Sequence, residues 1–187
     1  MPDTHALLDL EHFLPYRLSV LSNRISQTIA ETYVERFGIA IPEWRVIAVL
    51  GRHPGLSANG VAVRTAMDKV AVSRTLARLL ERGIVQRDTH GDDRRRSVLE
   101  LSAAGYRIYD DVVPLALGRE RDLLAHFSDE DVQQLDALLT KLGQGLHDLN
   151  RDDLNRDDLN RDDLSMHDQS MQDQSRDDPD RPADTDD

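Results

Sequence analysis

The 187-residue chain contains no cysteine. Disulfide bonds, thiolate metal ligands, cysteine nucleophiles and thiol-based redox sensing are therefore excluded together. Aromatic residues make up only 4% of the chain, so its core must be built mainly from leucine, valine, isoleucine and alanine. No apolar run approaches the roughly 20 residues that a membrane-spanning helix needs.

Signals for export and for catalysis are also missing. The N-terminal stretch "MPDTHALLDLEHF" has no basic region followed by a cleavage-type segment, so we expect a cytoplasmic protein. The seven histidines form no metal motif, and the glycines follow no phosphate-binding pattern. We therefore expect no cofactor, no metal and no enzymatic activity.

Acidic residues dominate the net charge of −12, but the charge is unevenly distributed. Residues 150–187 hold 14 aspartates and 5 arginines, a net charge of −9, whereas residues 64–107 hold 10 basic and 6 acidic residues, a net charge of +4. Because the local charge sets the field that a DNA phosphate meets, the acidic total does not exclude DNA binding.

Apolar residues at helical spacing predict a mainly α-helical chain. The predicted helices span residues 7–37, 42–53, 57–66, 68–82, 104–127 and 128–146. Ser57, Asp68 and Ser128 can cap three of these helices, and Pro15 moves the expected start of the first helix to about residue 15. Gly83 can end the fourth helix.

A change of period after the fourth helix predicts a β-hairpin. The β-prone segments "IVQRDT" (residues 84–89) and "SVLELS" (residues 97–102) flank "HGDDRR", in which Gly91 is the turn residue. The tip carries Asp93, Arg94, Arg95 and Arg96. Taken alone, such a charge run is most simply a solvated turn.

The order of these elements is that of a winged helix-turn-helix. The exposed face of the helix at residues 68–82 can enter a major groove, and the hairpin arginines can reach a neighbouring minor groove, whose negative potential attracts guanidinium groups. That face carries Lys69, Val70, Ser73, Arg74 and Arg78. The helix alone could be an ordinary surface helix, and the hairpin tip alone could be a solvated turn. DNA binding explains why both occur together in this order.

Four stretches make the sequence similar to the MarR family of bacterial transcriptional regulators. They are "IPEWRVIAVL" (residues 41–50), residues 56–87, "DDRRRSVLELSAAG" (residues 92–105) and "SDEDVQQLDALLTKL" (residues 128–142). The resemblance covers about residues 10–146. The wing pattern of Asp, any residue, Arg, then a strand, is its most specific part when it follows a helix-turn-helix.

The resemblance implies roles for individual residues. Arg95 matches the minor-groove arginine, Asp93 the carboxylate that orients the wing, and Arg94 and Arg96 phosphate contacts. The positions where the family's recognition helix meets DNA are here Lys69, Val70, Ala71, Ser73 and Arg74.

The chain departs from the family at three positions. Val70 and Ala71 stand where hydroxyl residues are often found, and they favour contact with a thymine methyl group instead. Gly60 stands where Glu often closes a capping box with Ser57, which predicts a softer third helix.

The resemblance also implies an obligate homodimer and a pocket for a small effector, often a phenolic or other aromatic acid. We expect residues 1–40 and 103–149 to form the interlocked dimerisation region and residues 41–102 the DNA-binding lobe, with the pocket between them. Candidate pocket residues are His12, Tyr16, Arg17 and Trp44. Core packing of Trp44 and ion pairing of Arg17 are the alternatives.

Residues 150–187 are acidic and repetitive. "NRDDL" occurs three times in tandem, and "SMHDQ" and "SMQDQ" continue the five-residue period. Leucines five apart step about 140° around a helix, so they form no apolar stripe. Low hydrophobicity and high net charge predict disorder, and a pentapeptide β-solenoid is the alternative.

The sequence therefore predicts a mainly α protein with a small β-hairpin wing, a winged helix-turn-helix joined to a helical dimerisation region. It predicts a ligand-responsive homodimer, most simply a repressor, that binds a pseudo-palindromic operator in double-stranded DNA. The alternative is a protein-interaction module that uses the acidic tail or the winged helix without sequence-specific DNA binding.

Overall fold

The computed structural model describes the backbone of residues 5–89 and 97–174 and the side chains of residues 5–87 and 98–151. The chain divides into two compact units, residues 1–125 and 126–187. The expected dimerisation region, residues 1–40 with 103–149, therefore spans both units. Within the described residues, no helix is long and apolar enough to cross a membrane.

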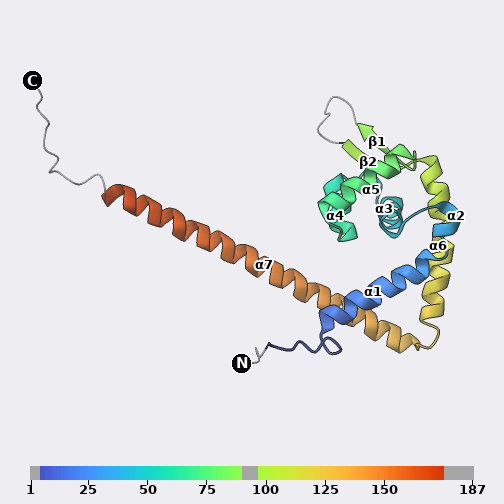
Figure 1. Ribbon diagram of the computed structural model, residues 1–187, viewed down its shortest axis with the longest axis horizontal. Helices are drawn as coiled ribbons and strands as arrows, with labels where there is room; N and C mark the ends of the chain where they lie inside the picture. The colour runs from blue at the N-terminus through green and yellow to red at the C-terminus, as the bar shows by residue number, and fades with distance from the viewer. Residues whose placement is uncertain (1–4, 90–96, 175–187) are drawn as a thin grey trace, which may run out of the picture. The chain divides into compact units, whose positions relative to one another are not determined.

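The first unit is mainly α-helical with one two-stranded antiparallel sheet, as the sequence predicts (Figure 1). Its elements are α1 (Leu14–Ala30), α2 (Val34–Phe37), α3 (Ile41–Arg52), α4 (Ala58–Thr65), α5 (Lys69–Glu81), β1 (Val85–Thr89), β2 (Ser97–Leu101) and α6 (Ala103–Leu123). The second unit contains α7 (Asp129–Gln174).

Helices α3, α4 and α5 enclose the main core together with the hairpin. Each contributes an apolar face that is removed from water, which is the dominant favourable term in folding. The fully buried side chains of this core include Val46, Ile47, Leu50, Val61, Val72, Leu79 and Val85. Valine, leucine and isoleucine thus fill the core, as the low aromatic content predicts.

The hairpin pairs Val85 with Leu101 at its base and Thr89 with Ser97 at the end of its described ladder. The segment before α4 adds a further antiparallel bridge, in which the Leu99 N–H donates to the Leu56 carbonyl at 2.8 Å. The hairpin is therefore attached to the helical lobe along one strand, while residues 90–96 join the two strands.

The first predicted helix is shorter than expected and is interrupted. It begins at Leu14, with Pro15 in its first turn, and ends at Ala30, and α2 follows after a three-residue turn. In this turn the Thr32 hydroxyl donates to the Ile29 carbonyl at 2.6 Å, and Tyr33 is buried at 1% exposure. Burying the Tyr33 ring in the core takes precedence over continuing the helix.

Helix α6 packs against α1 and α3 and ends at Leu123, four residues before its predicted end. Ser102 caps it, since its hydroxyl accepts from the Gly105 N–H at 3.1 Å and donates to the Gly83 carbonyl at 2.6 Å. The same residue thus starts α6 and ties it to the turn that ends α5.

Helix α7 begins with a capping box, as predicted. The Asp131 N–H donates to the Ser128 hydroxyl at 3.2 Å, and the Ser128 N–H donates to the Asp131 carboxylate at 2.9 Å. These hydrogen bonds hold the pKa of Asp131 below its usual value.

Helix α7 continues into the acidic repeat and ends at Gln174. The stretch 150–174 contains no proline or glycine, and each repeat arginine follows an aspartate three residues earlier, a spacing that favours helical ion pairs. The first such pair, Arg151 with Asp148, is 3.8 Å long. This spacing is compatible with the helical backbone of the described part of the repeat.

Gly105 provides a test of this packing. A Cβ at this position would collide with the Ile84 carbonyl oxygen, a backbone atom held in place by the Ser102 N–H at 3.0 Å. We expect Gly105→Ala to lower the free energy of unfolding by about 1–3 kcal/mol in denaturant titrations. The control is Gly118→Ala on the same helix, where the nearest atom is the Arg121 guanidinium at 3.8 Å. Equal stability of the two variants would contradict the packing described.

Candidate nucleic-acid interface

Helix α5 is built to bury one face and expose the other. Asp68 caps it, accepting from the Ala71 N–H at 2.8 Å, and Gly83 ends it with a φ of 64°. The buried stripe consists of Val72, Thr75, Leu76 and Leu79. Both ends and the buried face of the predicted recognition helix are therefore where the sequence places them.

The opposite face of α5 gathers the DNA-contact residues predicted on this helix. Lys69, Val70, Ser73, Arg74 and Arg78 are exposed, and Ala71 is half-buried. Val70 is 58% exposed, which is unusual for a valine and leaves its methyl groups free to meet a partner. The N-terminal half of α5 thus exposes two cations (Lys69 and Arg74), the hydroxyl of Ser73 and the apolar side chain of Val70. Arg78 lies one turn further along the helix.

The turn before α5 is tight. Ser57 caps α4 by accepting from the Gly60 N–H at 3.1 Å, and α4 is closed by its C-cap residue Ala66, whose φ of 52° lies in the left-handed region. This backbone allows α4 and α5 to be joined by three residues, as in a helix-turn-helix.

The corner between α3 and α4 adds positive charge. Arg52 and Arg64 are exposed, and both act electrostatically on His53. Partial desolvation, followed by the fields of Arg64 and Arg52, lowers the pKa of His53. The shift favours the neutral imidazole, so the positive charge of this corner comes from the two arginines.

The wing residues lie outside the described residues. Asp93, Arg94, Arg95 and Arg96 belong to the segment that joins β1 to β2. The paired strands confirm the hairpin on which the sequence places them.

Glu43 and Arg82 form a polar connection that sequence reasoning missed. Glu43 is buried at 5% exposure, and its carboxylate accepts from the Ala40 N–H at 2.9 Å at the start of α3. Arg82 lies 3.4 Å from one carboxylate oxygen of Glu43, and Arg78 lies 3.5 Å from the other. The sequence shows only that Glu43 is the second residue of a predicted helix and that Arg82 directly precedes Gly83. Neither fact reveals that the two side chains meet.

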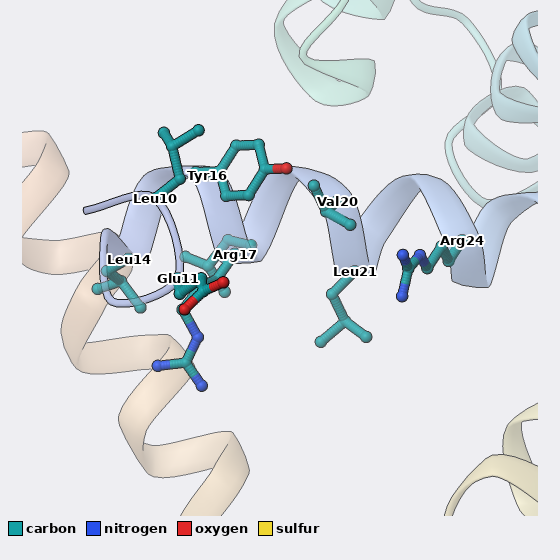
Figure 2. Close-up of a pocket in the computed structure, with 9 residues that line it drawn as sticks. Leu10, Glu11, Leu14, Tyr16, Arg17, Val20, Leu21 and Arg24 are labelled. Carbon is teal, nitrogen blue, oxygen red and sulfur yellow. The ribbon is translucent and has the colours of Figure 1, made fainter. Parts of the chain in front are cut away.

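The four predicted effector contacts do not line one pocket. Tyr16 and Arg17 line an open groove along the start of α1, together with apolar residues such as Leu14 and Leu21 (Figure 2). His12 is exposed before the helix, with its Nδ1 2.8 Å from the Asp9 carboxylate.

Trp44, the fourth candidate, lies on α3 and does not line that groove. It is half-buried, between Tyr33 at a ring-centroid distance of 5.6 Å and Tyr109 at 6.3 Å. Burial raises the pKa of Tyr33 to about 12, against a smaller opposing effect of Arg45. The Arg45 guanidinium donates to the Ser26 hydroxyl at 3.3 Å.

The left-handed backbone at Ala66 gives a measurable expectation. A side chain with a Cβ is strained there by roughly 1 kcal/mol, so Ala66→Gly should stabilise the fold by up to about that amount. Ala77→Gly, on the exposed face of α5, should instead destabilise it by about 1 kcal/mol. Thermal and denaturant unfolding of both variants measure the difference, and destabilisation by Ala66→Gly would contradict the turn geometry.

Comparisons with known proteins agree with this architecture. A family model described as the MarR family matches residues 37–96, which include α3, α4, α5 and β1. The uncharacterized HTH-type transcriptional regulator YwoH of Bacillus subtilis is 30% identical over 110 residues, which cover 59% of this chain and 80% of that protein.

Two further relatives extend the likeness. The homoprotocatechuate degradative operon repressor of Escherichia coli is 26% identical over 106 residues, covering 57% of this chain and 72% of the repressor. The crystal structure of a MarR/EmrR family transcriptional regulator from Acinetobacter sp. ADP1 is 29% identical, with a TM-score of 0.69 over 74% of this chain and 98% of that chain. Sequence, fold and the amphipathic α5 thus lead to one conclusion: the chain belongs to the MarR family of transcriptional regulators.

Proposed function

We propose that this chain is a dimeric repressor that binds a pseudo-palindromic operator through α5 and the hairpin and leaves it when a small aromatic acid binds. The observation that carries the proposal is the outer face of α5, where Lys69, Val70, Ser73 and Arg74 are exposed opposite a buried stripe. This face has the size, charge and mixture of contacts that a major groove accepts.

The side chains of α5 suggest a division of labour on DNA. The Arg74 guanidinium can donate two hydrogen bonds to the O6 and N7 atoms of a guanine, and Val70 can contact a thymine methyl group. Lys69 lies at the first turn of the helix and suits a phosphate. In this arrangement Arg74 and Val70 read sequence, and Lys69 supplies affinity.

The wing residues complete the contact as a proposal from the sequence. Arg95 is assigned to the minor groove, Asp93 to its orientation, and Arg94 and Arg96 to phosphates. The antiparallel pairing of the described strands, from Val85 with Leu101 to Thr89 with Ser97, supports this assignment.

Exposed apolar side chains support a homodimer. Leu14 and Leu21 of α1, Leu117 of α6, and Leu138 and Leu146 of α7 are each more than two-fifths exposed. Such apolar area is unusual on a monomer and suits a second copy of the chain. A two-fold dimer places two α5 helices on half-sites one DNA turn apart, which is why a pseudo-palindrome is proposed. Binding of chromosomal DNA also implies action in the cytoplasm of a bacterium.

The aromatic cluster around Trp44 supports a site for the effector. Tyr33 lies in the turn between α1 and α2, Trp44 on α3 and Tyr109 on α6, and Arg45 adds a cation beside Ser26. Aromatic faces and a guanidinium suit an aromatic carboxylate. The similarity to a repressor of homoprotocatechuate degradation is consistent with this ligand class.

DNA binding is tested by replacing Arg74. We expect Arg74→Ala to weaken binding to the operator by about 1–3 kcal/mol and to relax the preference at one base position in each half-site. Fluorescence anisotropy with the DNA upstream of the protein's own or a neighbouring gene, at fixed salt, measures both effects. Arg119→Ala, which removes the same charge from α6, should bind as the wild type does. Equal losses on operator and random DNA would reduce Arg74 to a phosphate contact.

Effector binding is tested with the single tryptophan of the chain as the probe. Benzoate and hydroxylated phenylacetates should change the fluorescence of Trp44 saturably and release the operator, and Arg45→Ala should weaken both effects several-fold if Arg45 pairs with the carboxylate. The uncharged methyl esters are the matched control. Equal binding of acids and esters would contradict the assignment of Arg45.

A further inference from the structure

Arg82 joins the end of the recognition helix to two other parts of the chain. It follows the last residue of α5, and its guanidinium donates to the Gly38 carbonyl at 3.1 Å and to the Phe37 carbonyl at 3.2 Å. Both carbonyls lie at the C-terminus of α2, where unpaired carbonyl groups and the helix dipole favour a cation. The third partner is the carboxylate of Glu43 on α3, at 3.4 Å.

Glu43 holds these parts together because it is buried and charged. Its carboxylate receives the Ala40 N–H, Arg82 and, through Nε at 3.5 Å, Arg78 one turn earlier on α5. Leaving a buried carboxylate without its cations costs free energy, so we expect the two arginines to stay beside Glu43. Arg78, which is a predicted DNA contact, thus also forms an ion pair with the buried Glu43.

The apolar contacts of α5 cannot fix its direction by themselves. Leu76 and Leu79 hold the helix against the core, but the hydrophobic effect is non-directional and tolerates small rotations and shifts. Charge-assisted hydrogen bonds have defined lengths and angles. The three hydrogen bonds of Arg82 therefore restrict the small rotations and shifts of α5 that the apolar stripe permits.

We propose that Arg82 and Glu43 are positioning residues for DNA recognition, which set the direction of α5 relative to α2 and α3 so that its N-terminal face meets the groove. The inference rests on the proposed DNA binding by α5. Neither residue needs to touch DNA. Helix α2 is also joined to α6, because Arg36 of α2 lies 3.4 Å from Asp111 of α6. Through α2, the contacts of Arg82 therefore connect the recognition helix to α6.

Binding measurements separate positioning from the other two roles that Arg82 could have. We expect Arg82→Ala to weaken operator binding about tenfold, while binding to random duplex and the salt slope stay at wild-type values. A phosphate contact would lower both affinities and reduce the slope by about one. A purely structural role would lower the melting temperature and leave the operator affinity of the folded protein unchanged. Either of these results would overturn the proposal.

Two milder substitutions keep the test decisive if Arg82→Ala folds poorly. Arg82→Lys retains a cation but not the planar fork, so it should recover only part of the operator affinity. Glu43→Gln removes the charge at nearly constant shape and should cause a loss similar to that of Arg82→Ala. The double variant should lose less than the sum of the two, since both act through one contact. Additive losses would contradict the shared role, and Arg119→Ala controls for the lost charge.

A measurement without DNA distinguishes failure of this inference from failure of the proposed function. Because the chain has no cysteine, spin labels can be attached at Ala77→Cys on α5 and Asp110→Cys on α6, both exposed positions, in protein diluted with unlabelled chain. The distance distribution should be narrow with Arg82 present and should broaden or shift in Arg82→Ala. An unchanged distribution would overturn the positioning role. If the wild-type protein binds no DNA, the proposed function is contradicted, but the spin-label distances still report whether Arg82 sets the direction of α5.

Discussion

The structure depends on one constraint: α5 must bury one face completely while the opposite face stays free. Val72, Leu76 and Leu79 meet the first requirement and are at most 3% exposed. The other elements of the lobe serve this helix. Helices α3 and α4 supply the surface that its stripe covers, Asp68 and Gly83 fix where it begins and ends, and the hairpin follows directly from its last turn. Because the stripe holds the helix from one side only, the polar side chains of the other side remain available to a partner.

Charge is arranged so that the acidic total does not oppose DNA. Residues 64–107 carry a net +4, and residues 150–187 carry −9. A phosphate close to α5 meets mainly the local cations, because at 0.15 M salt fields from charges more than about 8 Å away are largely screened. Within the lobe, the one buried carboxylate among the described residues is Glu43, and it is matched by cations on both sides.

The parts of the fold that could be predicted are those set by neighbouring residues. The caps at Ser57, Asp68 and Ser128, and the hairpin after Gly83, depend on interactions within a few positions, and the structure confirms them. The break in the first helix could not be predicted, because it depends on the burial of Tyr33 against Trp44, eleven positions later. The link between Glu43 and Arg82 joins residues 39 apart, and the pattern of either helix alone carries no sign of it. The exposed residues of α5 could be predicted, but the sequence did not show that Tyr16 lines a groove on α1 while Trp44 packs beside Tyr109, because these surroundings depend on contacts between distant segments.

The central claim is that α5 reads DNA sequence in the context of a two-fold dimer. Selection of bound duplexes from a random pool by the wild-type protein, followed by sequencing, tests it most directly. The account predicts an enriched motif of two inverted half-sites whose centres are one helical turn apart, about 10–10.5 base pairs. Retention of duplexes without any enriched motif would contradict sequence reading by α5, and a single asymmetric motif would contradict the two-fold dimer.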